Sequence, residues 1–324
     1  MKRNQPPHVL LITLDQFRGD ALGSAGHPLV QTPHLDELAA NGVRFARHYT
    51  QSTPCAPGRA GLYTGMYQMN HRVVANGTPL DRRFDNVALF ANRAGYESVL
   101  FGYTDQSIDP RLTTSATDRR LDTYEGLLPG FAWIVNLSED HQPWKDHLAA
   151  KGYDVSGGHL ELLATEHERP ADVGVSAFTT DRIIEWLDGR DDPSSPWLLH
   201  ASYLRPHPPY SAPGVFSDLY DPAEVGTPIA PHENRHVLHD LLLQFPHTAA
   251  PTDPDELAHL RSQYFGLISA VDCEIGRLTE HLRRSGLWES TIVIITADHG
   301  EQLGDHGLKE KVGYFEESHH IPLI

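Results

Sequence analysis

The chain has 324 residues, 40% of them hydrophobic and 21% charged, which is the composition of an ordinary globular protein able to bury a full core. Its 26 basic and 43 acidic residues give a formal net charge of −17, so we expect no nucleic-acid partner, because such binding depends on neutralising phosphates with Lys and Arg. Two cysteines are too few for a disulfide framework or a zinc finger.

The first expected element is a strand over residues 8–15, where the sequence reads HVLLITLD. This apolar run is too short for the hydrophobic region of a signal peptide and far too short to cross a membrane. We therefore expect a cytoplasmic protein without a membrane partner.

Three further apolar runs predict strands, over residues 96–105, 197–207 and 291–299. Their hydrophobicity is continuous rather than alternating, which is typical of strands covered on both faces in a parallel sheet. Helical patterns lie between the strands. One begins at Thr32-Pro33 and ends at Gly42, and a longer one covers residues 257–284. Strands alternating with helices predict an α/β fold.

Polar side chains stand where each predicted strand ends. They are Asp15, Tyr103, Asp105, His207, Asp298 and His299. Because open parallel sheets bind ligands at the carboxyl ends of their strands, we expect these residues to meet at one functional edge.

Two stretches break the alternation of strands and helices. Residues 106–170 are polar and aromatic without clear periodicity, and residues 205–256 are rich in Pro and His. We expect both to be loop excursions over the functional edge, where they would shape a substrate pocket. The last residues, 320–324, read as the start of another strand, so we expect a catalytic domain that lacks its C-terminal part.

A cysteine at a helix start is the sharpest local signal. The sequence Cys55-Ala56-Pro57-Gly58-Arg59 places Pro57 in a first helical turn, so Cys55 lies at the positive end of the helix dipole. Arg59 follows four residues later and could neutralise negative charge that develops at Cys55. Taken alone, such a cysteine is more often a small buried hydrophobe, and the motif by itself leaves both interpretations open.

The segment CAPGRAGLYTG, residues 55–65, resembles the maturation motif of the sulfatase family, CxPxR with a following Thr-Gly. Other family features occur in the expected order over nearly the whole chain: Asp15 after the first strand, Asp298-His299-Gly300 after a late strand, then Gly304-Asp305-His306 and the lysines Lys309 and Lys311. The resemblance implies one sulfatase-type catalytic domain over residues 1–324. It also implies an alkaline phosphatase-like sandwich, in which a large central mixed, mostly parallel β-sheet is flanked by helices.

The resemblance further implies a chemistry. In this family a formylglycine-generating enzyme oxidises the motif cysteine, here Cys55, to formylglycine (3-oxoalanine). The hydrated aldehyde is then the nucleophile in a covalent displacement at sulfur or phosphorus of a small anionic ester. The chain is therefore expected to be an ester hydrolase.

Details of the motifs resemble phosphonate monoester hydrolases and phosphodiesterases more than typical arylsulfatases. Sulfatases usually carry paired acids where this chain has Asp15-Gln16, and Asp-Asn where it has Asp298-His299. By the same resemblance, the substrate is bound or protonated by Gln16, Asn76, Tyr103, His207 and Lys311, and Arg59 stabilises charge. Asp105 departs from the pattern, since a Thr is expected there and an acid should repel an anionic oxygen. Sulfate, phosphonate and phosphodiester substrates therefore stay open.

The expected metal ligands are Asp15, Cys55 in its modified form, Asp298 and His299, with the amide of Gln16 nearby. Calcium prefers an all-oxygen shell, whereas an imidazole suits transition metals and zinc. The set favours one manganese ion, with calcium and zinc as alternatives.

Two rival functions fit the same residues. One is a metal-dependent phosphoesterase that uses unmodified Cys55 or water as the nucleophile. The other is a non-catalytic homologue that retains the pocket to hold an anion. The sequence is compatible with a homo-oligomer but does not fix the oligomeric state.

Overall fold

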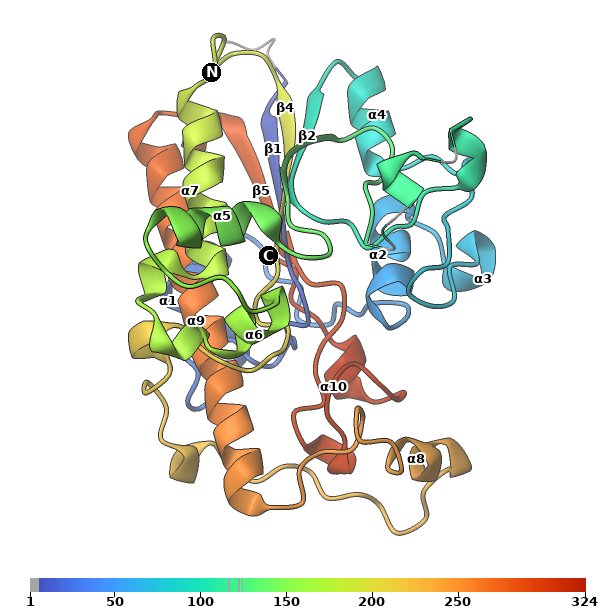
Figure 1. The fold of residues 1–324 in the computed structure, drawn as a ribbon, viewed down its shortest axis with the longest axis vertical. Coiled ribbons are helices and arrows are strands. Elements are labelled where there is room, and N and C mark those ends of the chain that lie inside the picture. Colours follow the sequence, from blue (N-terminus) through green and yellow to red (C-terminus); the bar gives the residue numbers. More distant parts are fainter. Residues whose placement is uncertain (1–5, 116, 122, 124) are drawn as a thin grey trace.

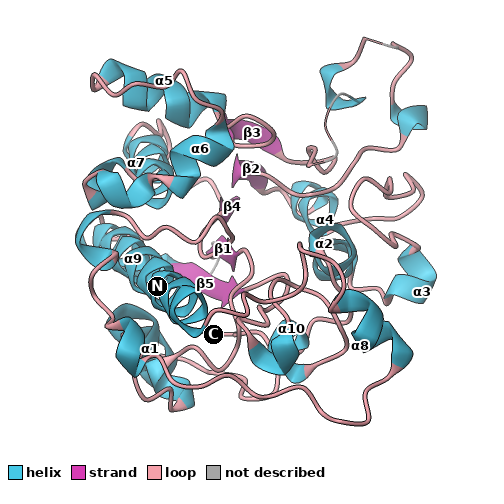
Figure 2. Cartoon of the chain, turned by 60° about the horizontal axis from the view of Figure 1, so that its bottom comes forward, coloured by secondary structure: helices cyan, strands magenta, loops and turns pink. Residues whose placement is uncertain are grey.

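A parallel sheet forms the centre of the computed structural model, which describes residues 6–115, 117–121, 123 and 125–324. Its five strands lie in the order β3-β2-β4-β1-β5; Figure 1 labels β1, β2, β4 and β5, and Figure 2 labels all five. Their bounds are β1 (His8–Leu14), β2 (Glu97–Gly102), β3 (Ala132–Asn136), β4 (Trp197–Tyr203) and β5 (Thr291–Thr296). In the central strand β1, Leu11 pairs in parallel register with His200 of β4 on one side and Ile294 of β5 on the other.

Helices cover both faces of this sheet (Figure 2). On one face lie α1 (Pro33–Asn41), α5 (Gln142–Ala150), α6 (His159–Ala164), α7 (Val175–Asp188) and α9 (Pro254–Arg284); on the other lie α2 (Cys55–Thr64), α3 (Gln68–His71) and α4 (Val87–Arg93). Side chains alternate between the two cores, since Leu10 and Ile12 pack with the first group of helices and Leu11 packs with the second. Burial on both faces explains why the strand sequences are continuously apolar.

The remaining helices are short. They are α8 (Val237–Leu242) and α10 (Glu316–His319). Single 3₁₀ turns occur at Gly23–Ala25, Pro110–Leu112, Arg119–Leu121, Glu166–Glu168, Ala171–Val173, Gly214–Phe216, Pro222–Glu224, Trp288–Ser290 and Asp305–Gly307. Within the described ranges, no helix is both long and apolar enough to cross a membrane.

The predicted α/β class with a mostly parallel sheet is confirmed, and four of the five strands lie within the predicted runs. The stretch 106–170 was expected to be a loop but contains β3, α5 and α6. Residues 116, 122 and 124 of this stretch lie outside the described residues, as do residues 1–5 of the expected domain. β3 was not predicted from the sequence because it is an edge strand. Only Val135 of its five residues is buried, so the strand has no continuous apolar run. The stretch 205–256 is largely irregular, as expected, apart from two 3₁₀ turns, α8 and the first residues of α9.

An antiparallel pairing follows at the outer edge of β5. Leu323 forms an antiparallel bridge with Thr296, and the backbones of Ile295 and Ile324 exchange two hydrogen bonds of 2.9 and 3.0 Å. The segment that was expected to begin a strand therefore pairs with β5 and gives the sheet a mixed character.

Candidate active site

The carboxyl ends of the two neighbouring strands β1 and β5 bring three predicted site residues together. Asp15 directly follows β1, and Asp298 and His299 come two and three residues after the end of β5. The chain turns at Gln16, whose positive φ of 69° is unfavourable for a residue with a side chain. In this turn the Gln16 backbone N–H donates a 3.1 Å hydrogen bond to Asp298 Oδ1, which fixes the two strand ends relative to each other.

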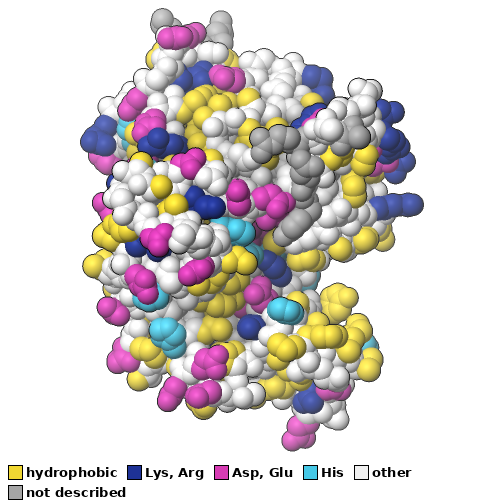
Figure 3. All heavy atoms as spheres, in the orientation of Figure 1, with side chains coloured by type: hydrophobic (Ala, Val, Ile, Leu, Met, Phe, Trp, Pro, Cys, Tyr) yellow, Lys and Arg dark blue, Asp and Glu magenta, His cyan; other side chains and the backbone are white. Residues whose placement is uncertain are grey.

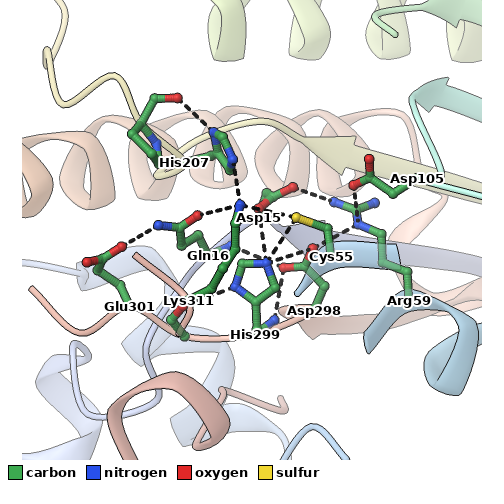
Figure 4. A network of polar contacts seen from close by, with 12 residues as sticks. Asp15, Gln16, Cys55, Arg59, Asp105, His207, Asp298, His299, Glu301 and Lys311 are labelled. Carbon is green, nitrogen blue, oxygen red and sulfur yellow. Dashed lines mark hydrogen bonds and ion pairs between the residues drawn. The ribbon is translucent and has the colours of Figure 1, made fainter. Parts of the chain in front are cut away.

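Four of the predicted residues could hold one cation (Figure 4). Ligand atoms of Asp15, Cys55, Asp298 and His299 all lie within 4.8 Å of one another, and all four residues are buried. His299 Nδ1 lies 3.0 Å from the carbonyl oxygen of Gly300, so Nδ1 carries the proton and Nε2 keeps its lone pair for a metal. Asp15 Oδ1 is buried and has no hydrogen-bond partner among the described residues, as expected of an oxygen that serves a cation. The donor set therefore fits a divalent metal ion.

Helix α2 begins at Cys55 and points its positive end at this cluster. Cys55 Sγ lies 3.2 Å from both His299 Nε2 and Lys311 Nζ. The helix can approach β5 so closely because residue 58 is glycine: a Cβ there would lie 2.6 Å from the carbonyl oxygen of Asp298. Burial raises the pKa of the Cys55 thiol well above its usual value, although Lys311 opposes this shift.

Arg59, one turn further along α2, is fully buried among acids. Its guanidinium lies 2.9 Å from Asp298 Oδ2, 3.0 Å from Asp15 Oδ2 and 3.2 Å from Asp105 Oδ2. The Arg59 side chain thus neutralises part of the negative charge that gathers around Cys55. Burial disfavours ionised Asp15, but the nearby charges of His207, Arg59 and Lys311 outweigh burial and hold its pKa below the usual range.

The Lys311 side chain contacts three other site residues. Its Nζ lies 3.2 Å from Cys55 Sγ, 3.0 Å from Gln16 Oε1 and 2.8 Å from His207 Nε2. Burial works against its charge, but the nearby Cys55 and Asp15 outweigh burial and raise the pKa of the amine. The neighbouring Lys309, also named from the sequence, donates its backbone N–H to the carbonyl oxygen of Thr248 at 2.8 Å.

His207 is held at the site by the loop that follows β4. His207 Nδ1 lies 2.7 Å from the carbonyl oxygen of Pro208, so its Nε2 faces Lys311. Burial and the charge of Lys311 lower the pKa of His207 to about 4. The loop itself is held by the buried Arg205, which donates to the carbonyl oxygens of His207 and Pro209 and pairs with Glu166.

Glu301 is a site residue that sequence analysis missed. Its carboxylate accepts a hydrogen bond from the Gln16 amide and a 2.8 Å hydrogen bond from Tyr210 Oη. It also accepts from the backbone N–H groups of Leu303 and Glu310 at 2.8 and 2.7 Å. Because Glu301 holds the nitrogen end of the Gln16 amide, the oxygen end is directed at Lys311. The only sequence signal was its place two residues after His299.

The other predicted residues lie around this centre in different ways. Tyr103 Oη donates a 2.7 Å hydrogen bond to Asp15 Oδ2. The preceding Gly102 adopts a φ of 109°, and a Cβ there would lie 2.2 Å from the carbonyl oxygen of Ser202 in β4. Asn76 is exposed, and its Oδ1 accepts a 3.0 Å hydrogen bond from the backbone N–H of Ala56 in α2. Asp105 is buried against Arg59.

Comparison with known proteins gives a consistent set of relatives. Residues 7–324 match the sulfatase family profile. The chain is 35% identical over 349 residues to the multifunctional alkaline phosphatase superfamily protein PehA of Trinickia caryophylli, covering 98% of this chain and 67% of that protein. It is 28% identical to a choline-sulfatase of Rhizobium meliloti, covering 98% of this chain and 62% of the relative.

Solved structures of phosphonate monoester hydrolases resemble the whole fold. The enzyme of Agrobacterium radiobacter superimposes with a TM-score of 0.86 at 38% identity, and that of Silicibacter pomeroyi with 0.84 at 34%. Each match covers 98% of this chain and 67% of the solved chain. The chain thus spans about two thirds of the length of the relatives that it matches.

Proposed function

The chain belongs to the sulfatase family, and from that premise we propose that it is a metal-dependent hydrolase of sulfate esters or of phosphonate monoesters and phosphodiesters. Cys55, oxidised to formylglycine, is the proposed nucleophile. The observation that carries the proposal is the position of Cys55 Sγ, 3.2 Å from both His299 Nε2 and Lys311 Nζ and inside a buried cluster of metal-binding atoms. In the matured protein, a hydroxyl of the hydrated aldehyde would stand where this sulfur lies.

Asp15, Asp298, His299 and the modified Cys55 would hold one divalent ion. Such an ion lowers the pKa of a bound hydroxyl group and polarises an ester oxygen. The imidazole favours manganese, with zinc and calcium as alternatives. The lack of a partner for Asp15 Oδ1 among the described residues and the lone pair of His299 Nε2, which faces Cys55 Sγ, support this assignment.

The cationic side chains would bind and stabilise the anion. Lys311 Nζ reaches Cys55, Gln16 and His207 at once, so it lies where negative charge develops on the transferred group. Arg59 would offset the charge of the surrounding acids and so prevent them from repelling the substrate. Asn76 would contribute its amide nitrogen, because its oxygen already accepts from the N–H of Ala56.

His207 would supply the proton that the leaving alcohol requires. Its Nε2 faces the site, and its Nδ1 is committed to the carbonyl oxygen of Pro208. Proton donation matters most when the leaving group is a poor one, such as an alkoxide. Gln16 and Tyr103 would act by orienting Lys311 and Asp15, respectively.

The rival thiol mechanism is less well supported. Burial raises the pKa of the Cys55 thiol well above its usual value, which disfavours the thiolate that this mechanism requires as long as no cation is bound. A hydrated aldehyde also brings a second hydroxyl, which lets the spent nucleophile release the anion, and a thiol lacks it. A non-catalytic binding protein would use Lys311 to hold an anion but would not need His207 as a proton donor beside it.

The deciding experiment is mass spectrometry of the tryptic peptide 48–59, taken from protein expressed together with a formylglycine-generating enzyme. Conversion of Cys55 makes this peptide about 18 Da lighter. The matured protein should hydrolyse phosphonate monoester, phosphodiester or aryl sulfate probes, and Cys55→Ala should abolish turnover while binding of Mn²⁺ stays within a few-fold. Only unmodified cysteine, together with turnover, would favour the thiol phosphoesterase; bound metal without turnover would favour the binding protein.

A further inference from the structure

A hollow of about 590 Å³ opens beside the candidate active site. One wall comes from the segment before α2 and from the residues around α3, and the other comes from α8 and from residues 311–319. Apolar side chains dominate these walls, namely those of Val74, Leu238, Leu241, Leu242, Val312 and Tyr314. Hydrophobic side chains gather on the lobe that carries α8, at the lower right of the molecule (Figure 3).

These apolar residues are unusually open to solvent. Val74 is 65% exposed, Leu238 45%, Leu241 46% and Tyr314 85%. Single exposed apolar residues are common on protein surfaces, but several that converge on one hollow usually mark a binding site. The volume lies in the range of pockets that enclose small organic molecules.

The charge of the hollow differs from that of the rest of the chain. None of the described residues that line it is acidic, although the chain carries a formal charge of −17. A second hollow of about 700 Å³ is lined by three acids, Asp218, Asp221 and Glu224. An anionic ester would be repelled by the second hollow and tolerated by the first, whose lining includes Lys311.

Lys311 also joins the hollow to the reacting atoms. It lines the hollow, while its Nζ lies 3.2 Å from Cys55 Sγ and 2.8 Å from His207 Nε2. Thr53 and Pro54, which directly precede Cys55, line the same hollow. A molecule bound there would therefore meet the site on the side where Lys311 and His207 stand.

We propose that this hollow binds the apolar part of the leaving alcohol or phenol, so that the preferred substrates are esters of hydrophobic alcohols. The proposal rests on the proposed function, because it takes His207 and Lys311 to stand beside the leaving oxygen. The sulfur or phosphorus group would remain at Cys55, and the hydrophobic substituent would lie between α8 and Val74.

The test is a substrate series in which the leaving alcohol alone grows. Ethyl, propyl and butyl esters of phenylphosphonate keep the reacting phosphorus and the basicity of the alkoxide nearly constant. The value of kcat/KM should rise roughly fourfold per added methylene, as expected when each methylene leaves water. A matched series with one phenol as leaving group and a growing alkyl group retained on phosphorus should stay flat. A slope in the retained series, or none in the leaving series, would overturn the proposal. If only sulfate esters react, alkyl sulfates replace the first series.

Two variants on α8 provide the control. Leu241→Asn places a polar group in the wall of the hollow and should reduce the slope of the leaving-group series by half or more. Val237→Asn makes a similar change at a 70% exposed residue of the same helix that does not line the hollow, and its slope should equal that of the parent protein. Equal slopes for both variants would contradict the assignment.

A binding measurement separates this proposal from the proposed function. Titration calorimetry with 2-naphthol, an apolar phenol, needs no turnover. Binding that is weakened several-fold in Leu241→Asn but kept in Val237→Asn would support the hollow even if no ester were hydrolysed, and only the proposed function would then fail. Naphthol binding that is absent, or the same in both variants, would overturn the hollow whatever the esterase activity.

Discussion

Lys311 Nζ lies 2.8 Å from His207 Nε2, so the proposed charge-stabilising amine and the proposed proton donor share one contact. In this arrangement neutral His207 accepts a hydrogen bond from the ammonium group and has no proton of its own to give at Nε2. Burial and the charge of Lys311 lower the pKa of His207 to about 4. The protonated form is therefore the minor one near pH 7.

A pH dependence follows from this lowered pKa. The fraction of free protein with protonated His207 falls as pH rises above about 4. Alkyl esters, which need the proton, should lose kcat/KM up to tenfold per pH unit relative to aryl esters with good leaving groups. Taking the ratio of the two substrates between pH 5 and 8 cancels the titration of the nucleophile and of the metal ligands.

His207→Ala provides the control for that experiment. It should slow alkyl esters by a factor of roughly 10² or more and good aryl esters far less, and it should flatten the pH dependence of the ratio. Equal losses for both substrates would remove His207 from the acid role. A ratio already flat in the parent protein would point to Lys311 as the proton donor.

The choice of metal can be altered through His299. Replacing it by Asn exchanges an imidazole nitrogen for an amide oxygen in a set whose other ligands offer oxygen. We expect His299→Asn to weaken Mn²⁺ binding by roughly tenfold or more and Ca²⁺ binding less, as measured by titration calorimetry. His232→Asn, a change at an exposed histidine, serves as the control. Equal losses for both ions would mean that His299 does not set the preference.

Glu301 should matter for both stability and catalysis. Four donors converge on its carboxylate, two of them backbone N–H groups. Glu301→Gln turns one acceptor into a donor that must face another donor, which should lower the free energy of unfolding by about 1–3 kcal/mol. Without the Glu301 carboxylate, the Gln16 amide is no longer held toward Lys311, so kcat/KM should also fall.

Urea denaturation and steady-state kinetics measure the two effects of Glu301→Gln. Glu289→Gln, at an exposed residue, should change neither quantity. A loss of stability with unchanged kcat/KM would show that Glu301 does not orient the catalytic groups.

Much of this site could be predicted because strand ends are readable in a sequence. A continuous apolar run that ends in an acid locates Asp15 and Asp298, and parallel pairing of β1 with β5 then brings the two side chains to one edge. Cys55 was readable because a proline two residues later marks a helix start. These signals are local, and parallel strand topology supplies the rest.

Other parts of the site depend on long-range contacts that no local pattern encodes. Glu301 and Gln16 are 285 positions apart, and Arg205 and Glu166 are 39 apart. The wall that α8 contributes to the hollow lies in a stretch that was expected to be a loop. Asp105 was noted as an unexpected acid, but its contact with Arg59 required the three-dimensional arrangement.

Asp105, Asp15 and Asp298 share the single guanidinium of Arg59, so ionisation of all three would leave excess negative charge beside the substrate. Burial raises the pKa of Asp105 well above its usual value, although Arg59 opposes this shift. At a pH above this raised pKa, where the carboxylate is charged, Asp105→Asn or Asp105→Thr removes a like charge and should lower KM for anionic esters by roughly tenfold. Divalent-cation affinity should fall at the same time, since the cation loses an attractive charge. Measuring KM and Mn²⁺ affinity for both variants tests the tighter substrate binding and the weaker cation binding together. Unchanged values in Asp105→Asn would show that Asp105 is protonated in the native protein, because the amide then replaces a group that was already neutral.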